Sequence, residues 1–153
     1  MADSYFRAAV GAFIVNNNGQ MLVVLKHKYF DKWHIVKGGL ERGETELEAL
    51  KREIIEELGD IKFKILKKSM ISSVVANSNV SGPDYIGQAR NNYWVLVDSN
   101  QKFDIPNNEL EKYKWIDIDC DQIKKHFGIH DEDGVLQTLL PFEWREVKKL
   151  LEI

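Results

Sequence analysis

The stretch GGLERGETELEALKREIIEELG, residues 38–59, decides the fold of this chain because both ends of one helix can be identified in it. Thr45 is followed three residues later by Glu48, which matches a capping box and predicts that the helix begins at Thr45. Gly59 suits the left-handed position that ends a helix. At about 100° per residue, the large aliphatic residues between these ends share one arc, which predicts the face toward the core: Leu47, Leu50, Ile54 and Leu58.

The same helix carries three crowded glutamates, Glu53, Glu56 and Glu57, on the arc beside the aliphatic one. A like-charge pair at this spacing costs a helix about 0.2–0.5 kcal/mol, and crowded carboxylates raise one another's pKa unless a cation neutralises them. Mg²⁺ and Mn²⁺ prefer such oxygen ligands. The preceding Gly38 and Gly39 let the backbone approach a ligand, and the helix N-terminus offers N–H groups to phosphate oxygens. The stretch therefore predicts a cation site; a solvated acidic face is the alternative.

The flanking sequence predicts strands on both sides of this helix. Extended segments are expected at 7–16 and 21–28, joined by the hairpin turn NNNGQ, and at 32–39, 61–76, 86–98 and 112–119. Two further helices are expected at 121–127 and 140–151, the second with Pro141 in its first turn. Several strands with few helices between them favour the α+β class, as an α/β/α sandwich with a mixed sheet between helices, and not an all-parallel doubly wound fold.

Length, composition and charge predict one soluble globular domain spanning residues 1–153. The chain is 44% hydrophobic and 29% charged, with a net charge of -3 that predicts no bulk attraction to nucleic acid or membrane. No apolar run is long enough to span a bilayer. The single cysteine, Cys120, excludes an internal disulfide and fits a reducing compartment, so we expect a cytoplasmic protein.

The glycine, glutamate and arginine spacing resembles the Nudix box. That pattern is filled in order by Gly38, Glu44, Arg52, Glu53, Ile54, Glu56, Glu57 and Gly59. Its last, aliphatic place holds Asp60 instead, and we expect the next residue, Ile61, to pack in its stead. The order of elements fits the Nudix fold over nearly the whole chain.

The resemblance implies hydrolysis of a nucleoside diphosphate linked to another group, by attack of water on phosphorus with Mg²⁺ or Mn²⁺ as cofactor. The implied metal ligands are the Gly38 carbonyl and the Glu53, Glu56 and Glu57 carboxylates, with Glu53 as general base and Glu57 also catalytic. Arg52 and Glu44 are expected to orient this network by charged hydrogen bonds. Pairing of Arg52 with Glu48, four residues away, is the alternative.

Outside the box, the segment Ile86-Gly87-Gln88 resembles RNA pyrophosphohydrolases and diadenosine tetraphosphate hydrolases. By the same likeness Glu109 would complete the site and Arg7 would meet phosphate. Lys37, just before the glycines, is a further phosphate candidate because it projects beside the metal turn, and Tyr85, Tyr93 or Trp33 are candidates to stack a base. A solvated loop acid, an ordinary strand-end arginine and core aromatics are the alternatives. The alternation of Lys62 and Lys64 predicts a solvated strand face, with electrostatic attraction of RNA as the alternative.

Two classes of function follow. The first is a pyrophosphohydrolase acting on a dinucleoside polyphosphate or the 5′-triphosphate end of RNA, with a nucleotide-pool sanitiser (for oxidised nucleotides) or a nucleotide-sugar pyrophosphatase as runner-up. The second is a Nudix domain that binds nucleotide without cleaving it. The presence of all three box glutamates favours the enzyme. DNA and membrane partners are not expected.

Overall fold

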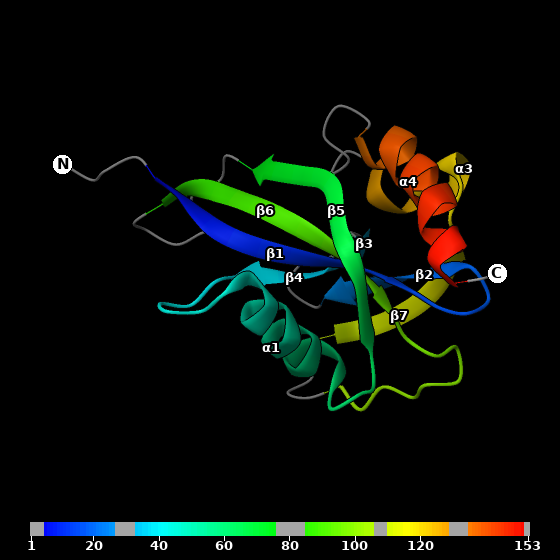
Figure 1. Cartoon of the computed structure of the whole chain (residues 1–153), viewed down its shortest axis with the longest axis horizontal. Coiled ribbons are helices and arrows are strands. Elements are labelled where there is room, and N and C mark those ends of the chain that lie inside the picture. The colour runs from blue at the N-terminus through cyan, green and yellow to red at the C-terminus, as the bar shows by residue number, and fades with distance from the viewer. Residues whose placement is uncertain (1–4, 27–32, 76–84, 106–109, 129–134, 152–153) are drawn as a thin grey trace.

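A sheet of seven strands lies between helix α1 on one face and helices α3 and α4 on the other (Figure 1). The computed structural model describes residues 5–26, 33–75, 85–105, 110–128 and 135–151. The strands are β1 (Tyr5–Val15), β2 (Gln20–Lys26), β3 (Trp33–His34), β4 (Val36–Gly39), β5 (Lys64–Val75), β6 (Tyr85–Leu96) and β7 (Leu110–Asp117). The helices are α1 (Glu46–Leu58), α3 (Cys120–Phe127) and α4 (Val135–Leu151).

The sheet mixes parallel and antiparallel pairs, which confirms the predicted class. β1 runs parallel to β6, while β5 pairs antiparallel with β6 and β7 pairs antiparallel with β2. β4 pairs antiparallel with β1, placing Gly38 opposite Val10. The predicted hairpin joins β1 to β2: the Asn16 side chain accepts backbone hydrogen bonds inside the turn, and Gly19 has a φ of 78°.

Each face of the sheet has its own core. The α1 face packs aliphatic residues of the central strands against that helix, including Val10, Ala12, Val36, Leu50 and Ile54. The α3–α4 face buries larger rings, including Phe13, Trp94 and Trp144, against Ile123 and Leu140. Among the helices of the described part of the chain, none combines the length and apolar character needed to cross a membrane.

The predicted ends of α1 are confirmed. The Thr45 and Glu48 side chains form a capping box, and Gly59 follows the last helical residue with a φ of 92°. Ile61 is buried in the core beside α1, as expected for the residue that replaces the missing aliphatic position. The assignment of Leu47 to the core-facing arc is wrong, since its side chain is 46% exposed.

Compared with the predicted arc, the buried face of α1 is shifted around the helix, away from Leu47 and toward polar residues. At the first turn Glu46, not Leu47, faces the sheet, where its carboxylate accepts hydrogen bonds of 2.6 Å from Tyr93 and Asn91. Lys68 pairs with the same carboxylate at 3.2 Å. Three strand side chains therefore anchor the start of α1, and Leu47 is left at the edge of the contact.

The predicted start of the last helix is also wrong, because α4 begins at Val135 and contains Pro141 in its interior. Proline has no N–H, so the carbonyl four residues earlier, that of Gln137, loses its helical donor. The Sγ of Cys120, the first residue of α3, lies 3.1 Å from that carbonyl oxygen and donates to it. This contact compensates for the proline and joins the two helices.

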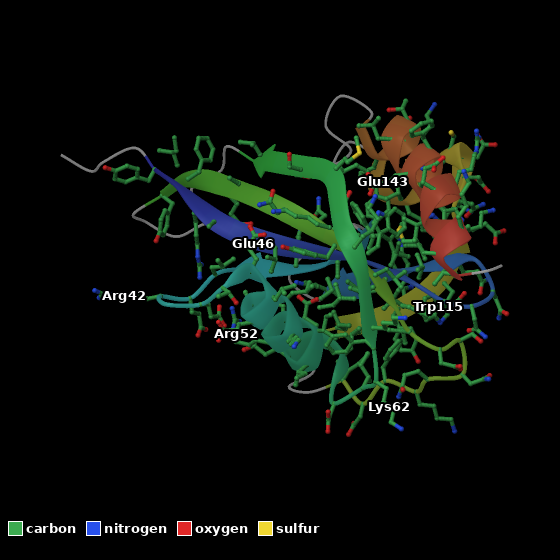
Figure 2. All side chains as sticks on the ribbon, in the orientation of Figure 1. Arg42, Glu46, Arg52, Lys62, Trp115 and Glu143 are labelled. Atoms are coloured by element: carbon green, nitrogen blue, oxygen red, sulfur yellow. The ribbon has the colours of Figure 1, made fainter. Side chains whose placement is uncertain are left out.

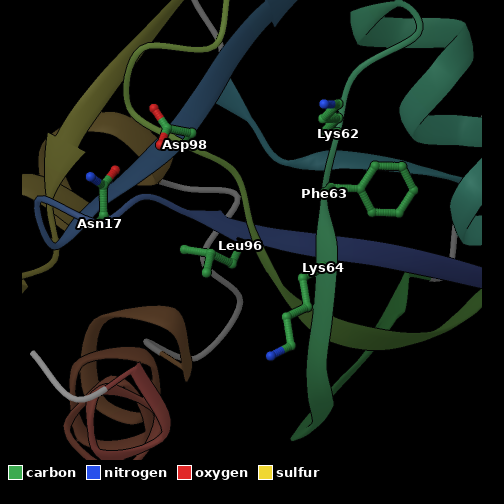
Figure 3. Close-up of a pocket in the computed structure, with 6 residues that line it drawn as sticks. All are labelled: Asn17, Lys62, Phe63, Lys64, Leu96 and Asp98. Atoms are coloured by element: carbon green, nitrogen blue, oxygen red, sulfur yellow. The ribbon is translucent and has the colours of Figure 1, made fainter.

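The lysines before and within β5 lie on the surface, as predicted from their alternation. Lys62 and Lys64 are exposed, whereas Phe63 and Ile65 pack partly buried against the α1-face core. A surface hollow near these lysines is lined by the six residues labelled in Figure 3, Asn17, Lys62, Phe63, Lys64, Leu96 and Asp98. No residue that fills the Nudix-box pattern lines this hollow.

Candidate active site

The close approach of β4 to α1 sets the geometry of the candidate site. An ideal Cβ on Gly38 would lie 2.0 Å from Cδ of Glu53 and 2.1 Å from its nearer carboxylate oxygen. Only a residue without a side chain leaves room for this carboxylate, because the pairing of β4 with β1 fixes the Gly38 backbone. The structure therefore brings together Gly38 and Glu53, two of the predicted metal ligands.

Arg52 connects the other parts of the site. It donates two hydrogen bonds to the Glu44 carboxylate, Nε to Oε2 at 2.6 Å and Nη2 to Oε1 at 2.8 Å, and a third to the Gly39 carbonyl at 2.9 Å. Its Nη1 contacts Glu53 Oε1 at 2.7 Å and Glu56 Oε2 at 3.2 Å. Figure 2 shows Arg52 on α1, near the loop that carries Arg42 at its tip. The predicted contacts of Arg52 are present, and the orienting role of Arg52 and Glu44 stays a prediction.

Charge pairing shifts the pKa of both partners in the arginine–glutamate fork. The hydrogen bonds from Arg52 lower the pKa of Glu44 to about 2, and the same hydrogen bonds raise the pKa of Arg52 above its ordinary value. The alternative pairing of Arg52 with Glu48 is not adopted, because the Glu48 carboxylate contacts Thr45 in the capping box. Both members of the fork are charged at neutral pH.

The three box glutamates occupy three different environments. The Glu53 side chain is 12% exposed, and burial raises its pKa although Arg52 acts in the opposite direction. The Glu56 side chain is 50% exposed, so it is the most accessible to solvent. The Glu57 carboxylate is buried and accepts from Nζ of Lys26, at the end of β2. Lys26 was not singled out from sequence.

The donor set fits a hard divalent cation. In the described ranges no group of three or more acidic, histidine or cysteine side chains converges as a ready-made metal cage. Instead, Arg52 holds Glu53 and Glu56 while Lys26 holds Glu57, so each carboxylate already has a counter-charge. Carboxylate and carbonyl oxygens are the ligands that Mg²⁺ and Mn²⁺ prefer. Glu53, Glu56, Glu57 and the Gly38 carbonyl are the residues that would hold such an ion.

Two predicted phosphate-binding residues lie beside the glycine turn. Nζ of Lys37 is 3.0 Å from Nδ1 of His34, and burial, with the nearby Arg90 charge, lowers the Lys37 pKa to about 7. Arg7 packs over Gly39, whose ideal Cβ would lie 2.3 Å from the arginine Nε, and donates to the Leu40 carbonyl at 3.4 Å. Both basic side chains therefore border the turn that precedes α1.

Arg90 is a buried cation that sequence reasoning missed. It is 8% exposed on β6, and its side chain passes over Gly11 of β1, where an ideal Cβ would lie 2.9 Å from the arginine Cδ. Asn92 crowds the same glycine, 2.3 Å from that position. The sequence does contain a signal for this cluster: polar residues recur at every second position of β6, and Gly11 interrupts the apolar strand β1 beside them.

The remaining predicted residues have different outcomes. Tyr93 is buried and bonded to Glu46, so it packs in the α1-face core and does not present its ring to a base. Tyr85 opens β6 opposite Tyr5 and is partly exposed, and its contact with substrate stays a prediction. Glu109 lies outside the described residues, and its role also stays a prediction.

Comparisons with known proteins identify one family. The family model of the NUDIX domain matches residues 5–134. An RNA pyrophosphohydrolase of Ruthia magnifica subsp. Calyptogena magnifica is 31% identical over 134 residues, covering 76% of this chain and 72% of that protein. One from Psychrobacter cryohalolentis is 43% identical over 122 residues, covering 72% and 70%. The E. coli dihydroneopterin triphosphate pyrophosphohydrolase shares the fold, with a TM-score of 0.69, 16% identity, and coverage of 88% and 96%.

Proposed function

The chain belongs to the NUDIX domain family, and on that basis we propose that it is a pyrophosphohydrolase that uses Mg²⁺ or Mn²⁺ to cleave the 5′-triphosphate end of RNA. The observation that carries the proposal is the placement of Glu53, Glu56 and Glu57 on α1 next to Gly38, with Arg52 joined to two of them. The relatives named as RNA pyrophosphohydrolases, at 31% and 43% identity, support the choice of substrate.

A divalent cation at these carboxylates would supply Lewis-acid chemistry, drawing charge from the pyrophosphate oxygens and lowering the pKa of a bound water. The chain's own residues then have separate tasks. Glu53 takes the proton of the attacking water at a carboxylate oxygen, a role suited to a partly buried carboxylate with a raised pKa. Arg52 fixes the rotamer of Glu53 through the 2.7 Å hydrogen bond and is itself fixed by Glu44.

Substrate orientation would fall to the two basic side chains that border the glycine turn. Lys37 directly precedes the glycines and Arg7 packs over Gly39, and both would bind phosphate oxygens of the substrate. Such contacts align the phosphorus with the water held near Glu53, which contributes to the rate by fixing the reacting geometry.

A dinucleoside polyphosphate is the second candidate substrate, favoured by the Gly87-Gln88 segment at the start of β6. Nucleotide-pool sanitising and nucleotide-sugar cleavage are further alternatives within the same chemistry. A binding domain without catalysis is the alternative of another class. It is disfavoured because the box carboxylates, the arginine and both end glycines are all present.

A phosphate-release screen tests the proposal. The panel contains 5′-triphosphorylated RNA, diadenosine polyphosphates, nucleoside triphosphates including oxidised ones, and nucleotide sugars, each with Mg²⁺ or Mn²⁺. We expect metal-dependent release, greatest with the RNA, and a loss of orders of magnitude in Glu53→Gln, an isosteric change that keeps the fold. Faster cleavage of another panel member would identify that compound as the substrate in place of RNA. Absence of phosphate release with every panel member, from protein that is folded and binds metal, would refute the enzyme assignment.

A further inference from the structure

A tryptophan with two lysines over its ring lies at the sheet edge formed by β3, β2 and β7. Nζ of Lys114 is 4.9 Å and Nζ of Lys112 is 5.8 Å from the ring centroid of Trp33, and the His126 ring meets it edge-on at 5.8 Å. Trp33 is partly exposed, and both lysines are exposed. We refer to Trp33, Lys112 and Lys114 as the Trp33 patch.

Strand register places the three side chains on the same face. Leu25 of β2 pairs with Trp33 on one side and with Lys112 on the other, and Val23 pairs with Lys114. Directly paired residues point to the same side of a sheet, so the patch residues flank the buried Leu25 and Val23. The patch therefore has a rigid base on the α3–α4 face of the sheet.

Positive charge is concentrated at this patch in a chain whose net charge is -3. Within the described part of the chain, no carboxylate lies within 4 Å of Nζ of Lys112 or Lys114. The last turn of α3 adds Lys124 and Lys125. Burial first, and then the charges of Lys114 and Lys125, lower the pKa of His126, which is consistent with cations converging there.

The patch is also close in sequence to the candidate active site, because β3 with Trp33 directly precedes β4 with Lys37. Trp33 and Lys37 are four residues apart, about 13 Å in an extended chain. Val36 packs on the α1 face, so its neighbour Lys37 and the more distant Trp33 belong to the opposite face. A substrate held by phosphate at Lys37 needs to extend by more than one phosphate group to reach Trp33.

We propose that the Trp33 patch binds single-stranded RNA, with one base stacked on Trp33 and backbone phosphates at Lys112 and Lys114. Aromatic rings flanked by cations bind single strands in this way, because every base has a face to stack and every nucleotide a phosphate to pair. The two lysines are exposed and unpaired with any described carboxylate, so they can turn from the ring to phosphate. This inference rests on the proposed function in one respect: cleavage at the box glutamates would place the 5′ end of the RNA near Lys37 and the following nucleotides at the patch.

Binding of a 5′-hydroxyl RNA oligonucleotide tests the patch without the cleavable anhydride. Fluorescence anisotropy should show Trp33→Ala weakening binding about 5- to 150-fold, the range expected for loss of one stacked base, while Trp33→Phe retains most of it. The double variant Lys112→Gln/Lys114→Gln should reduce the slope of log K against log salt by about 1.4, at roughly 0.7 per phosphate contact.

The matched control is Lys62→Gln/Lys64→Gln, two lysines labelled in Figure 3, which removes the same charge. These lysines lie before and within β5, at the opposite end of the strand order from β3. The control variant should leave binding and its salt slope unchanged. An equal loss of RNA affinity in both double variants would refute RNA binding at the Trp33 patch. Wild-type affinity in Trp33→Ala would refute it as well. Each variant is checked for a native melting temperature, and Trp33→Phe serves as the test if Trp33→Ala does not fold.

Two further readouts separate this inference from the proposed function. Failure of the enzyme assignment shows as absent phosphate release while the oligonucleotide still binds at the patch. If Trp33→Ala raises KM for diadenosine polyphosphates as much as for 5′-triphosphorylated RNA, the ring is a nucleoside subsite and the RNA proposal is refuted. A rise confined to the RNA substrate supports it.

Discussion

Replacing Gly38 with alanine should separate catalysis from stability. Nothing in the backbone opposes this change, because Gly38 is not among the glycines with positive φ and lies within paired strand β4. The obstacle is one side chain: the new methyl carbon would lie 2.0 Å from Cδ of Glu53. Since the strand pairing holds the backbone, the carboxylate must move.

The size of that movement sets the expected effect. To reach an ordinary carbon–carbon separation of about 3.5 Å, the Glu53 carboxylate must retreat by about 1.5 Å. A misplacement of about 1 Å at a reacting group costs on the order of 100-fold in rate. The retreat also breaks the 2.7 Å hydrogen bond from Arg52. We therefore expect kcat/KM to fall by about 100-fold or more.

Steady-state cleavage of 5′-triphosphorylated RNA measures the fall in kcat/KM, and urea unfolding measures the change in stability. Gly38→Ala should unfold within about 1 kcal/mol of the wild type, because a flexible carboxylate can move aside. Gly43→Ala is the control: its φ is 84° and no atom lies within 4 Å of its ideal Cβ. It should lose about 1–2 kcal/mol to strain yet keep its activity. Wild-type activity in Gly38→Ala would refute the close packing of the site.

Gly59→Ala should destabilise the fold by about 2–4 kcal/mol in urea unfolding, because φ is 92° and the new Cβ would lie 2.3 Å from the Asp104 carbonyl oxygen. A smaller loss would contradict that contact. Tyr93→Phe should cost about 1–2 kcal/mol at pH 7 by removing the 2.6 Å hydrogen bond to Glu46. The Glu46 pKa is lowered in the fold, so the difference between the two proteins should shrink as pH falls through that pKa; it should also disappear as pH rises through the Tyr93 pKa of about 12. A difference independent of pH in denaturation series would rule this explanation out. Arg52→Lys cannot reproduce the guanidinium fork, so kcat should fall by about 10- to 100-fold with circular dichroism unchanged, and full activity would remove the orienting role.

Local rules predicted α1 and the glutamates on it from sequence. A capping box and a terminal glycine depend on neighbouring residues alone, and the structure places both where the sequence does. The burial of Ile61 could be predicted because it is the apolar residue next to Asp60, which occupies the position where the pattern expects an aliphatic side chain. The mixed sheet followed from the order of extended and helical segments.

Failures came where a distant strand decided the outcome. Leu47 fits the helical arc, but the contacts of Glu46 with β5 and β6 rotate the helix at that turn. Lys26 pairs with Glu57 across 31 residues of sequence, which no local pattern encodes. Arg90 is buried because a glycine on the neighbouring strand makes room for it.

The predicted start of α4 was wrong because proline is most common in the first turn of a helix, which favoured a start just before Pro141. Here a thiol from α3 takes over the carbonyl that Pro141 leaves without a donor. Cys120 is also the only cysteine of the chain and is exposed. The protein thus contains a native, single-site chemical probe at a helix junction. A spectroscopic label attached to this exposed thiol reports on the environment of the α3–α4 junction, with no engineered cysteine.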